Sequence, residues 1–288
     1  MNTTFKLLDG KTVAQKVLDR CAKRVEQIID RTGATPCLAT VLVGDDPASV
    51  TYVRMKQRRC ESVGMLSMKV TLPGAITTEQ LVAQLGHLSQ DAAVNGILLQ
   101  HPVPSQIDER AAFEAIAAAK DVDGVTIHSF GTTAFGLPGF GCCTPAGIMR
   151  LLEAYNVPVA GMHAVVIGRS PILGKPMAMM LLGANATVTI CHSKTQHLPE
   201  LVRQGDLVVA AVGRAQFVQG DWIKPKAVVV DAGYNAGNVG DVDFQAAAVR
   251  ASMITPVPGG VGPMTIATLI DQTSIAAAKQ HKLELEED

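Results

Sequence analysis

A loop between an apolar run and a helical pattern has the residues to bind an anion. The segment VVIGRSPILGKPMAMMLL, residues 165–182, contains Gly168, Gly174 and Pro176. A nucleoside-triphosphate loop needs four residues between its glycines, then Lys and Ser or Thr, whereas here five residues intervene and Pro176 follows the lysine. That motif is therefore excluded. A strand before the loop and a helix after it would still aim backbone N–H groups at a phosphate. The loop alone fits an ordinary strand-to-helix turn equally well.

The residues after the next strand indicate which dinucleotide such a loop would bind. An NAD site usually carries Asp or Glu about 20 residues after the glycines, where it binds the ribose 2′-hydroxyl. Here the strand ATVTIC ends in HSKT, which supplies Ser193 and Lys194 but no acid, and Arg169 stands in the loop itself. A guanidinium, a hydroxyl and an ammonium suit a 2′-phosphate. The sequence favours NADP, with a solvated polar loop as the alternative.

These residues must be positioned by alternating strands and helices. Apolar strand patterns occur at CLATVLVG, SMKVTLP, NGILLQ, ATVTIC, DLVVAAVG, AVVVDAG and SMIT. Helical patterns between them predict right-handed crossovers and parallel sheets. The Gly-rich stretch 127–144 is expected to be an irregular linker. We expect an N-terminal α/β catalytic domain over 1–140, joined by a C-terminal helix over 265–288. Residues 141–264 should form a Rossmann-like, doubly wound parallel sheet, with the active site in a cleft between the domains.

Composition excludes several classes of protein. The chain has 288 residues and a net charge of −1, so it lacks the electrostatic footprint of a nucleic-acid-binding protein. Its six cysteines form no C-x-x-C pair, which argues against a disulfide framework or a zinc site and favours the cytoplasm. No secretory leader and no apolar run of about 18 residues is present, so no membrane association is expected. We expect no bound metal.

Six segments in one order carry a resemblance to a known family: TYVRMKQRRCESVG, GILLQHPVP, KDVDGVT, VVIGRSPILGKP, CHSKT and ITPVPGGVGPMT. Together they resemble the bifunctional methylenetetrahydrofolate dehydrogenase/methenyltetrahydrofolate cyclohydrolase family, from about residue 5 to 282. The resemblance implies NADP-dependent oxidation of 5,10-methylenetetrahydrofolate and hydrolysis of the product to 10-formyltetrahydrofolate. It also implies tetrahydrofolate derivatives as ligands and a homodimer.

The resemblance assigns four catalytic residues. Lys56 corresponds to the catalytic lysine, and Tyr52 lies one turn before it on the same helix face. Gln100 would orient the lysine, and Asp123 would bind the pterin, while Asp121 is expected to be a structural turn or cap residue. Without the resemblance, Lys56 among neighbouring arginines is typical of a solvated face, and Gln100 of a strand end in water.

The remaining site residues follow from the same resemblance. The cofactor set is Gly168, Arg169, Ser170, Ser193 and Tyr234. The substrate set is Tyr52, Lys56, Leu99, Gln100, Asp123, Pro258, Gly259, Gly260, Val261 and Gly262, whose glycines would let the backbone approach a flat ligand.

Three positions depart from the family pattern: His101 replaces a usual leucine, Arg59 a small residue and Tyr234 an aliphatic one. His101 and Tyr234 lie beside segments expected to line the cleft, so they bear on relative rates and inhibitor preference, and His101 receives no catalytic role. Two alternatives stay open. One is a dehydrogenase without cyclohydrolase activity, and the other is a non-catalytic folate-binding paralogue.

Overall fold

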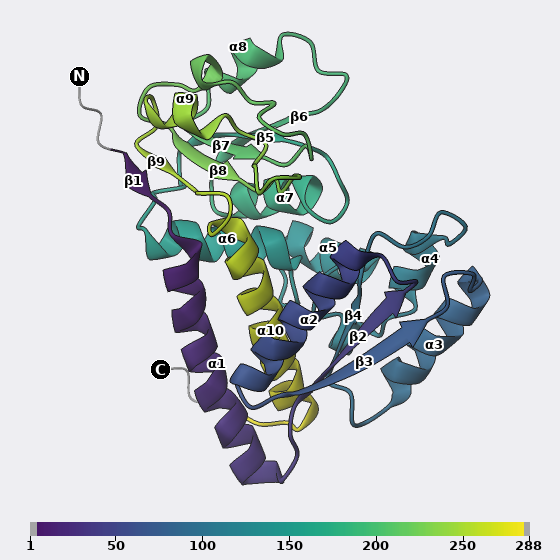
Figure 1. Cartoon of the computed structure of the whole chain (residues 1–288). Helices are drawn as coiled ribbons and strands as arrows, with labels where there is room; N and C mark the ends of the chain where they lie inside the picture. The colour runs from purple at the N-terminus through teal and green to yellow at the C-terminus, as the bar shows by residue number, and fades with distance from the viewer. Residues whose placement is uncertain (1–4, 285–288) are drawn as a thin grey trace. The chain divides into compact units, whose positions relative to one another are not determined.

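The computed structural model of the chain describes residues 5–284, which divide into two compact units (Figure 1). The three-stranded unit comprises Gln15–Thr132, Gly139–Gly141 and the residues from Ile266 onward. The six-stranded unit comprises the residues up to Ala14, Thr133–Pro138 and Cys142–Thr265. Every strand pair in both sheets is parallel, so the predicted two-domain α/β class is confirmed.

The sheet of the three-stranded unit has the order β3-β2-β4. Its strands are β2 (Cys37–Val43), β3 (Leu66–Leu72) and β4 (Gly96–Leu99). All residues of β2 and β4 are buried, which explains their unbroken apolar sequence. The helices are α1 (Gly10–Thr32), α2 (Pro47–Ser62), α3 (Thr78–Gln90), α4 (Glu109–Glu114), α5 (Ile127–Phe135) and α10 (Val261–Gln280), with a 3-10 turn η1 (Ala118–Lys120). Of these, α2 packs on β2 and β3, and α3 packs on β4.

The sheet of the six-stranded unit has the order β1-β9-β8-β7-β5-β6. Its strands are β1 (Lys6–Leu7), β5 (His163–Ile167), β6 (Thr187–Cys191), β7 (Leu207–Ala210), β8 (Val228–Asp231) and β9 (Met253–Ile254). The helices are α6 (Cys143–Ala154), α7 (Gly174–Gly183), α8 (Leu198–Val202), α9 (Phe244–Ala248) and the 3-10 turn η2 (Gly220–Trp222). The chain leaves β5 for β6 on one side and returns to β7 on the other, so the switch in strand order lies between β5 and β7.

Three segments differ from the sequence-based expectation. Strand β1 pairs with β9 in the six-stranded sheet, although the sequence placed residues 1–140 in the other domain. Residues 127–135 form α5 instead of an irregular linker, because Thr126 Oγ1 accepts from the N–H of Ser129 and caps the helix. The last helix begins at Val261, not 265. It ends at Gln280, where Leu283 N–H bonds back to Ala278 O past a left-handed residue. The predicted end at 288 lies outside the described residues.

Within residues 5–284, no helix combines the length and the apolar character needed to cross a bilayer.

Candidate active site

Helix α2 brings Lys56 against the end of strand β4. Asp46 caps the helix by accepting from the N–H of Ser49, and Pro47 occupies its first turn. Lys56 Nζ donates to Gln100 Oε1 at 3.0 Å across 44 residues of sequence. The predicted pair is therefore formed.

The amide of Gln100 is held in one orientation. Its Nε2 donates to the carbonyl of His101 at 2.8 Å, and its backbone N–H donates to Val41 O at 2.8 Å. The carbonyl of His101 can only accept, so the amide nitrogen faces it and Oε1 faces Lys56. An amide oxygen accepts from an ammonium or from a neutral amine, so Gln100 can hold the lysine in both protonation states.

Burial separates Lys56 from the cations around it. Tyr52 and Lys56 are half-buried on the same face of α2, whereas Arg54, Arg58 and Arg59 are exposed. The solvated-face interpretation therefore applies to the arginines and not to the lysine. Leu99, assigned to the substrate, is buried at the end of β4.

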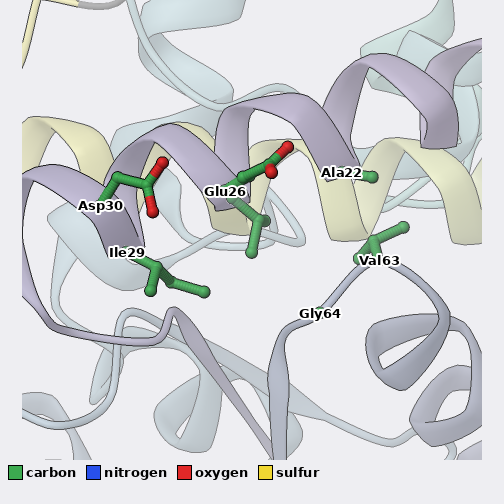
Figure 2. Close-up of a pocket in the computed structure, with 7 residues that line it drawn as sticks. Ala22, Glu26, Ile29, Asp30, Val63 and Gly64 are labelled. Atoms are coloured by element: carbon green, nitrogen blue, oxygen red, sulfur yellow. The ribbon is translucent and has the colours of Figure 1, made fainter.

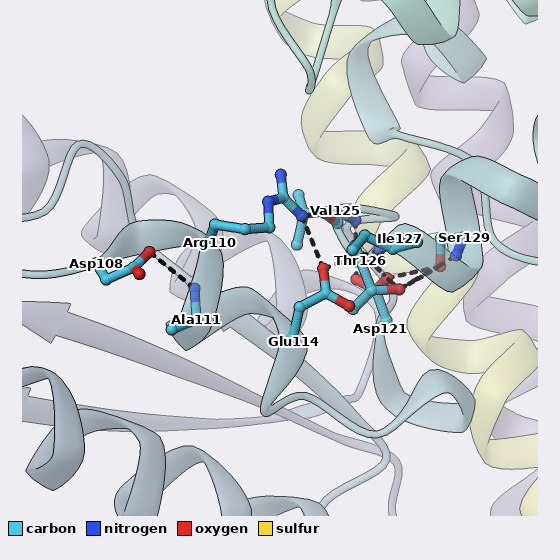
Figure 3. A network of polar contacts seen from close by, with 9 residues as sticks. All are labelled: Asp108, Arg110, Ala111, Glu114, Asp121, Val125, Thr126, Ile127 and Ser129. Atoms are coloured by element: carbon cyan, nitrogen blue, oxygen red, sulfur yellow. Dashed lines mark hydrogen bonds and ion pairs between the residues drawn. The ribbon is translucent and has the colours of Figure 1, made fainter.

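The KDVDG turn contains one structural and one accessible carboxylate. Asp121 is fully buried and accepts from the N–H groups of Val125 and Thr126 and from the hydroxyls of Thr126 and Ser129 (Figure 3). Its structural role is thus confirmed. Asp123 is half-buried in the turn that follows.

Two residues that the sequence analysis missed fix this turn. Gln272 of α10 is buried and donates to Val122 O at 2.7 Å and to Gly141 O at 3.0 Å. Lys120 is buried and donates to the carbonyls of Leu88 and Asp91 at the end of α3, and its burial lowers the pKa of its amine. The signal in the sequence that could have revealed Gln272 and Lys120 is a polar side chain inside an otherwise apolar pattern.

Replacing Asp121 should destabilise the protein. Asp121→Ala leaves four donors around a dry site without their acceptor, so we expect the free energy of unfolding to fall by about 3 kcal/mol. The matched control is Asp108→Ala, which removes one exposed N-cap bond to Ala111 N–H (Figure 3) and should lower it by about 1 kcal/mol. Urea unfolding measures both values, and equal losses would contradict the structural role of Asp121.

Two glycines of the predicted anion loop are required by close packing. A Cβ at Gly168, whose φ is +136°, would lie 2.2 Å from the carbonyl oxygen of Ala211 after β7. A Cβ at Gly174 would lie 2.3 Å from the carbonyl oxygen of Gly168. The loop is therefore folded tightly at the start of α7, where helix N–H groups and dipole favour an anion.

The loops after β5 and β6 lie next to each other. Ile167 pairs with Cys191, and Gly168 N–H donates to Cys191 O at 2.9 Å. Arg169 and Ser193 each stand two residues beyond this pair, and both are exposed. The Ser170 hydroxyl accepts from the N–H groups of Leu173 and Gly174, so it binds backbone donors just before and at the start of α7. The loop after β6 contains no acid to repel a 2′-phosphate, and these residues fit NADP.

Only part of loop 258–262, which is predicted to line the substrate site, is exposed. Gly259 has a φ of +109°, and a Cβ at Gly260 would lie 2.7 Å from the carbonyl oxygen of Pro256. Pro258 and Gly262 are exposed, whereas Gly259, Gly260 and Val261 are buried. A Cβ at Gly262 would meet nothing within 4 Å. Among Gly259, Gly260 and Gly262, it is Gly262 that has open space beside it.

A buried carboxylate that the sequence analysis missed, Asp231, organises the loop after β8. Asp231 ends β8 and accepts from the N–H groups of Gly233, Asp241 and Val242. Burial raises the pKa of Asp231 to about 6, against the opposing effect of these N–H groups. Tyr234, assigned to the cofactor, is exposed in the same loop. A polar residue at the carboxyl end of a buried strand is the signal that could have pointed to Asp231.

Two pockets are lined by residues other than the predicted site residues. One of about 200 Å³ lies between α1 and the end of α2 and is lined by Ala22, Val25, Glu26, Ile29, Asp30, Val63 and Gly64 (Figure 2). Another, of about 270 Å³, lies beside Asp231. Within the described part of the chain, no group of three or more His, Cys, Asp or Glu residues could hold a metal ion.

Known proteins of one family match nearly the whole chain. The family described as tetrahydrofolate dehydrogenase/cyclohydrolase matches with its catalytic domain over residues 8–123 and its NAD(P)-binding domain over residues 142–281. Bifunctional protein FolD 1 of Streptomyces avermitilis is 62% identical over 277 residues, covering 96% of both chains. Bifunctional protein FolD of Saccharophagus degradans is 60% identical over 274 residues, covering 95% of this chain and 98% of its own.

Solved structures of the same family also match the fold of this chain. The bifunctional FolD dehydrogenase/cyclohydrolase of Campylobacter jejuni has a TM-score of 0.93 at 43% identity, covering 96% of this chain and 99% of its own. The Trypanosoma brucei enzyme, complexed with NADP cofactor and an inhibitor, has a TM-score of 0.92 at 34% identity, covering 96% and 98%. The chain therefore belongs to the tetrahydrofolate dehydrogenase/cyclohydrolase family.

Proposed function

We propose that this chain oxidises 5,10-methylenetetrahydrofolate to 5,10-methenyltetrahydrofolate with NADP and then hydrolyses that product to 10-formyltetrahydrofolate. The observation that carries the proposal is the 3.0 Å hydrogen bond from Lys56 to Gln100, which places an amine at the end of a buried strand. The relatives named as bifunctional FolD proteins support both activities.

In the hydride step the chain's task is mainly to position the reactants. Bound NADP would supply the hydride acceptor, and the lone pairs of N5 and N10 would stabilise the cation formed when the bridge carbon loses its hydride. Little acid–base help is needed, because no proton moves at the reacting carbon. Tyr52 and Lys56 would orient the folate, while Asp123 would accept from the N–H and amine donors of the pterin.

The hydrolysis step requires a base. Water attacks the methenyl carbon while Lys56 accepts one of its protons. The bond from this carbon to N5 then breaks, the remaining water proton moves to N5, and the formyl group stays on N10. Gln100 keeps Lys56 in place before and after it takes the proton, because its amide oxygen accepts from both forms.

One experiment tests the proposal and its two alternatives. Methylenetetrahydrofolate is mixed with NADP, and NADP reduction and the methenyl product are followed separately by absorbance. The bifunctional enzyme should reduce NADP while methenyltetrahydrofolate stays low. Accumulation of that product would indicate a dehydrogenase alone, and no NADP reduction would indicate a non-catalytic folate-binding protein.

Cofactor choice gives a specific prediction. Arg169→Ala should raise the KM for NADP by about 10-fold to 100-fold, the effect of losing a charge-assisted hydrogen bond of about 1.5–3 kcal/mol, and should barely change the KM for NAD. The matched control is Arg203→Ala at the end of α8, where the arginine contacts Asp221 instead. Equal losses with NADP and NAD would refute the role of Arg169.

We also propose that the protein is a cytoplasmic homodimer. All six cysteines are buried thiols, as expected in a reducing compartment. The edge strand β3 carries Leu66 with 57% of its surface exposed, and an exposed edge of this kind can pair with a second copy. Sedimentation of the purified protein tests the dimer.

A further inference from the structure

We propose that Asp241 is a positioning residue for NADP, because its carboxylate gathers the backbone of the β7 loop and holds it against the dinucleotide loop. This inference rests on the proposed function, since it concerns the cofactor of the hydride step. Asp241 lies outside every motif that the family resemblance brought forward, and it would touch neither cofactor nor substrate.

The carboxylate of Asp241 fills an anion-binding nest made by its own chain. It accepts from three successive backbone N–H groups, those of Val212 at 2.6 Å, Gly213 at 2.9 Å and Arg214 at 2.9 Å. Successive N–H groups that converge in this way form a site for an anion. Asp241 is completely buried, so its carboxylate depends on these donors for its hydrogen bonds.

The same carboxylate also holds the loop after β8. Asn235 Nδ2 donates to Asp241 Oδ1 at 3.0 Å, one residue beyond Tyr234. The backbone N–H of Asp241 donates in turn to Asp231 Oδ1 at 2.9 Å, at the carboxyl end of β8. A Cβ at Gly233 would lie 2.2 Å from Asp241 Oδ1, so the packing around the carboxylate admits no side chain there.

The loop that Asp241 gathers lies directly against the dinucleotide loop. Ala211 N–H donates to Ile167 O at 2.8 Å, and the carbonyl of Ala211 is the group that a Cβ at Gly168 would strike. Strands β5 and β7 flank the switch in strand order, and ligands of such sheets bind beyond the carboxyl ends of the strands at that point. A shift of the β7 loop would therefore move the wall of the cofactor site.

The test replaces the charge while keeping the shape. Asp241→Asn leaves one acceptor oxygen and puts an amide N–H₂ where a second oxygen accepted, so at least one backbone N–H loses its partner. We expect the Kd for NADP, measured by titration calorimetry, to rise by about 10-fold or more, because a loop with an unpaired backbone N–H no longer holds the wall of the cofactor site in one position. Hydrolysis of added methenyltetrahydrofolate without NADP should stay within twofold of the wild type, because Lys56 and Gln100, the residues proposed for proton transfer, lie in the three-stranded unit.

The matched control is Asp206→Asn, at the amino-terminal edge of the same sheet. Asp206 also accepts from a backbone N–H, that of His163 at 3.0 Å, and it pairs with Lys224. This variant should bind NADP like the wild type. An unchanged NADP Kd in Asp241→Asn, or NADP binding and hydrolysis lost together, would overturn the proposal.

A second variant and a direct measurement of NADP binding complete the test. If Asp241→Asn is not recovered folded, Asn235→Ala removes one of the four bonds to the carboxylate and is judged by the same two measurements. NADP binding is measured directly, so a wild type that binds NADP without oxidising methylenetetrahydrofolate would refute the proposed function and still allow the role of Asp241 to be tested.

Discussion

Lys56→Met is expected to abolish cyclohydrolase activity and to leave a reduced but measurable dehydrogenase activity, so that methenyltetrahydrofolate accumulates. A positioned base contributes about 100-fold to 10,000-fold to a proton-transfer step, and methionine fills a similar volume without accepting a proton. Hydride transfer needs no base, so in this variant it is affected only by the loss of the contact through which Lys56 would position the substrate.

The chemistry of the substrate favours a neutral lysine at the moment of attack. A lysine in water has a pKa of about 10.4 and is almost fully protonated at neutral pH. A cation beside an amine disfavours the protonated form, and the methenyl group is such a cation. Gln100 binds the amine without adding a negative charge that would restore the proton.

Variants at Gln100 test this charge argument separately from the loss of the lysine. Gln100→Ala should shift the pH profile of hydrolysis more than that of hydride transfer. Gln100→Glu places a carboxylate 3 Å or so from the amine, which favours the ammonium form and should slow hydrolysis most at low pH. Both steps are assayed across pH 6 to about 9, a range that spans the operating pH of tuned lysine bases.

The control for Lys56→Met is Lys16→Met, which removes an exposed ammonium from α1 in the same unit and should leave both steps unchanged. Near-native hydrolysis of added methenyltetrahydrofolate by Lys56→Met would show that the lysine is not the base.

The second large effect is expected from Asp123→Ala, which should weaken folate binding while NADP binds normally. The paired donors of a pterin would lose their acceptor, at about 1–3 kcal/mol, or about 5-fold to 150-fold in affinity. Asp123→Asn retains one acceptor and should fall between the wild type and the alanine variant. Titration with folate in the presence of NADP measures the effect.

Stability distinguishes Asp123 from its neighbour in the same motif. Asp121→Ala should unfold at lower urea, because Asp121 holds the turn, whereas Asp123→Ala should unfold near the wild-type midpoint. Normal folate binding by Asp123→Ala would remove Asp123 from the site.

The sequence by itself determined the features that depend on neighbours along the chain. The i,i+4 spacing of Tyr52 and Lys56 places them on one face of a helix, and the glycines around 168–174 specify a strand–loop–helix turn. Alternating strand and helix patterns were enough to predict two parallel α/β domains. The absence of an acid after β6 could also be read without a structure, because the cofactor loop and the next strand are close in sequence.

Tertiary structure decided which polar groups meet. Sequence spacing could not distinguish Lys56 from the arginines beside it, because only the packing of α2 against the sheet brings one cation to Gln100, 44 residues away. The assignment of β1 to the six-stranded sheet likewise required pairing between Lys6 and Met253. Asp241 collects donors from separate loops that no periodicity relates. Contacts between distant segments depend on how whole elements pack, and local patterns along the chain carry no record of that packing.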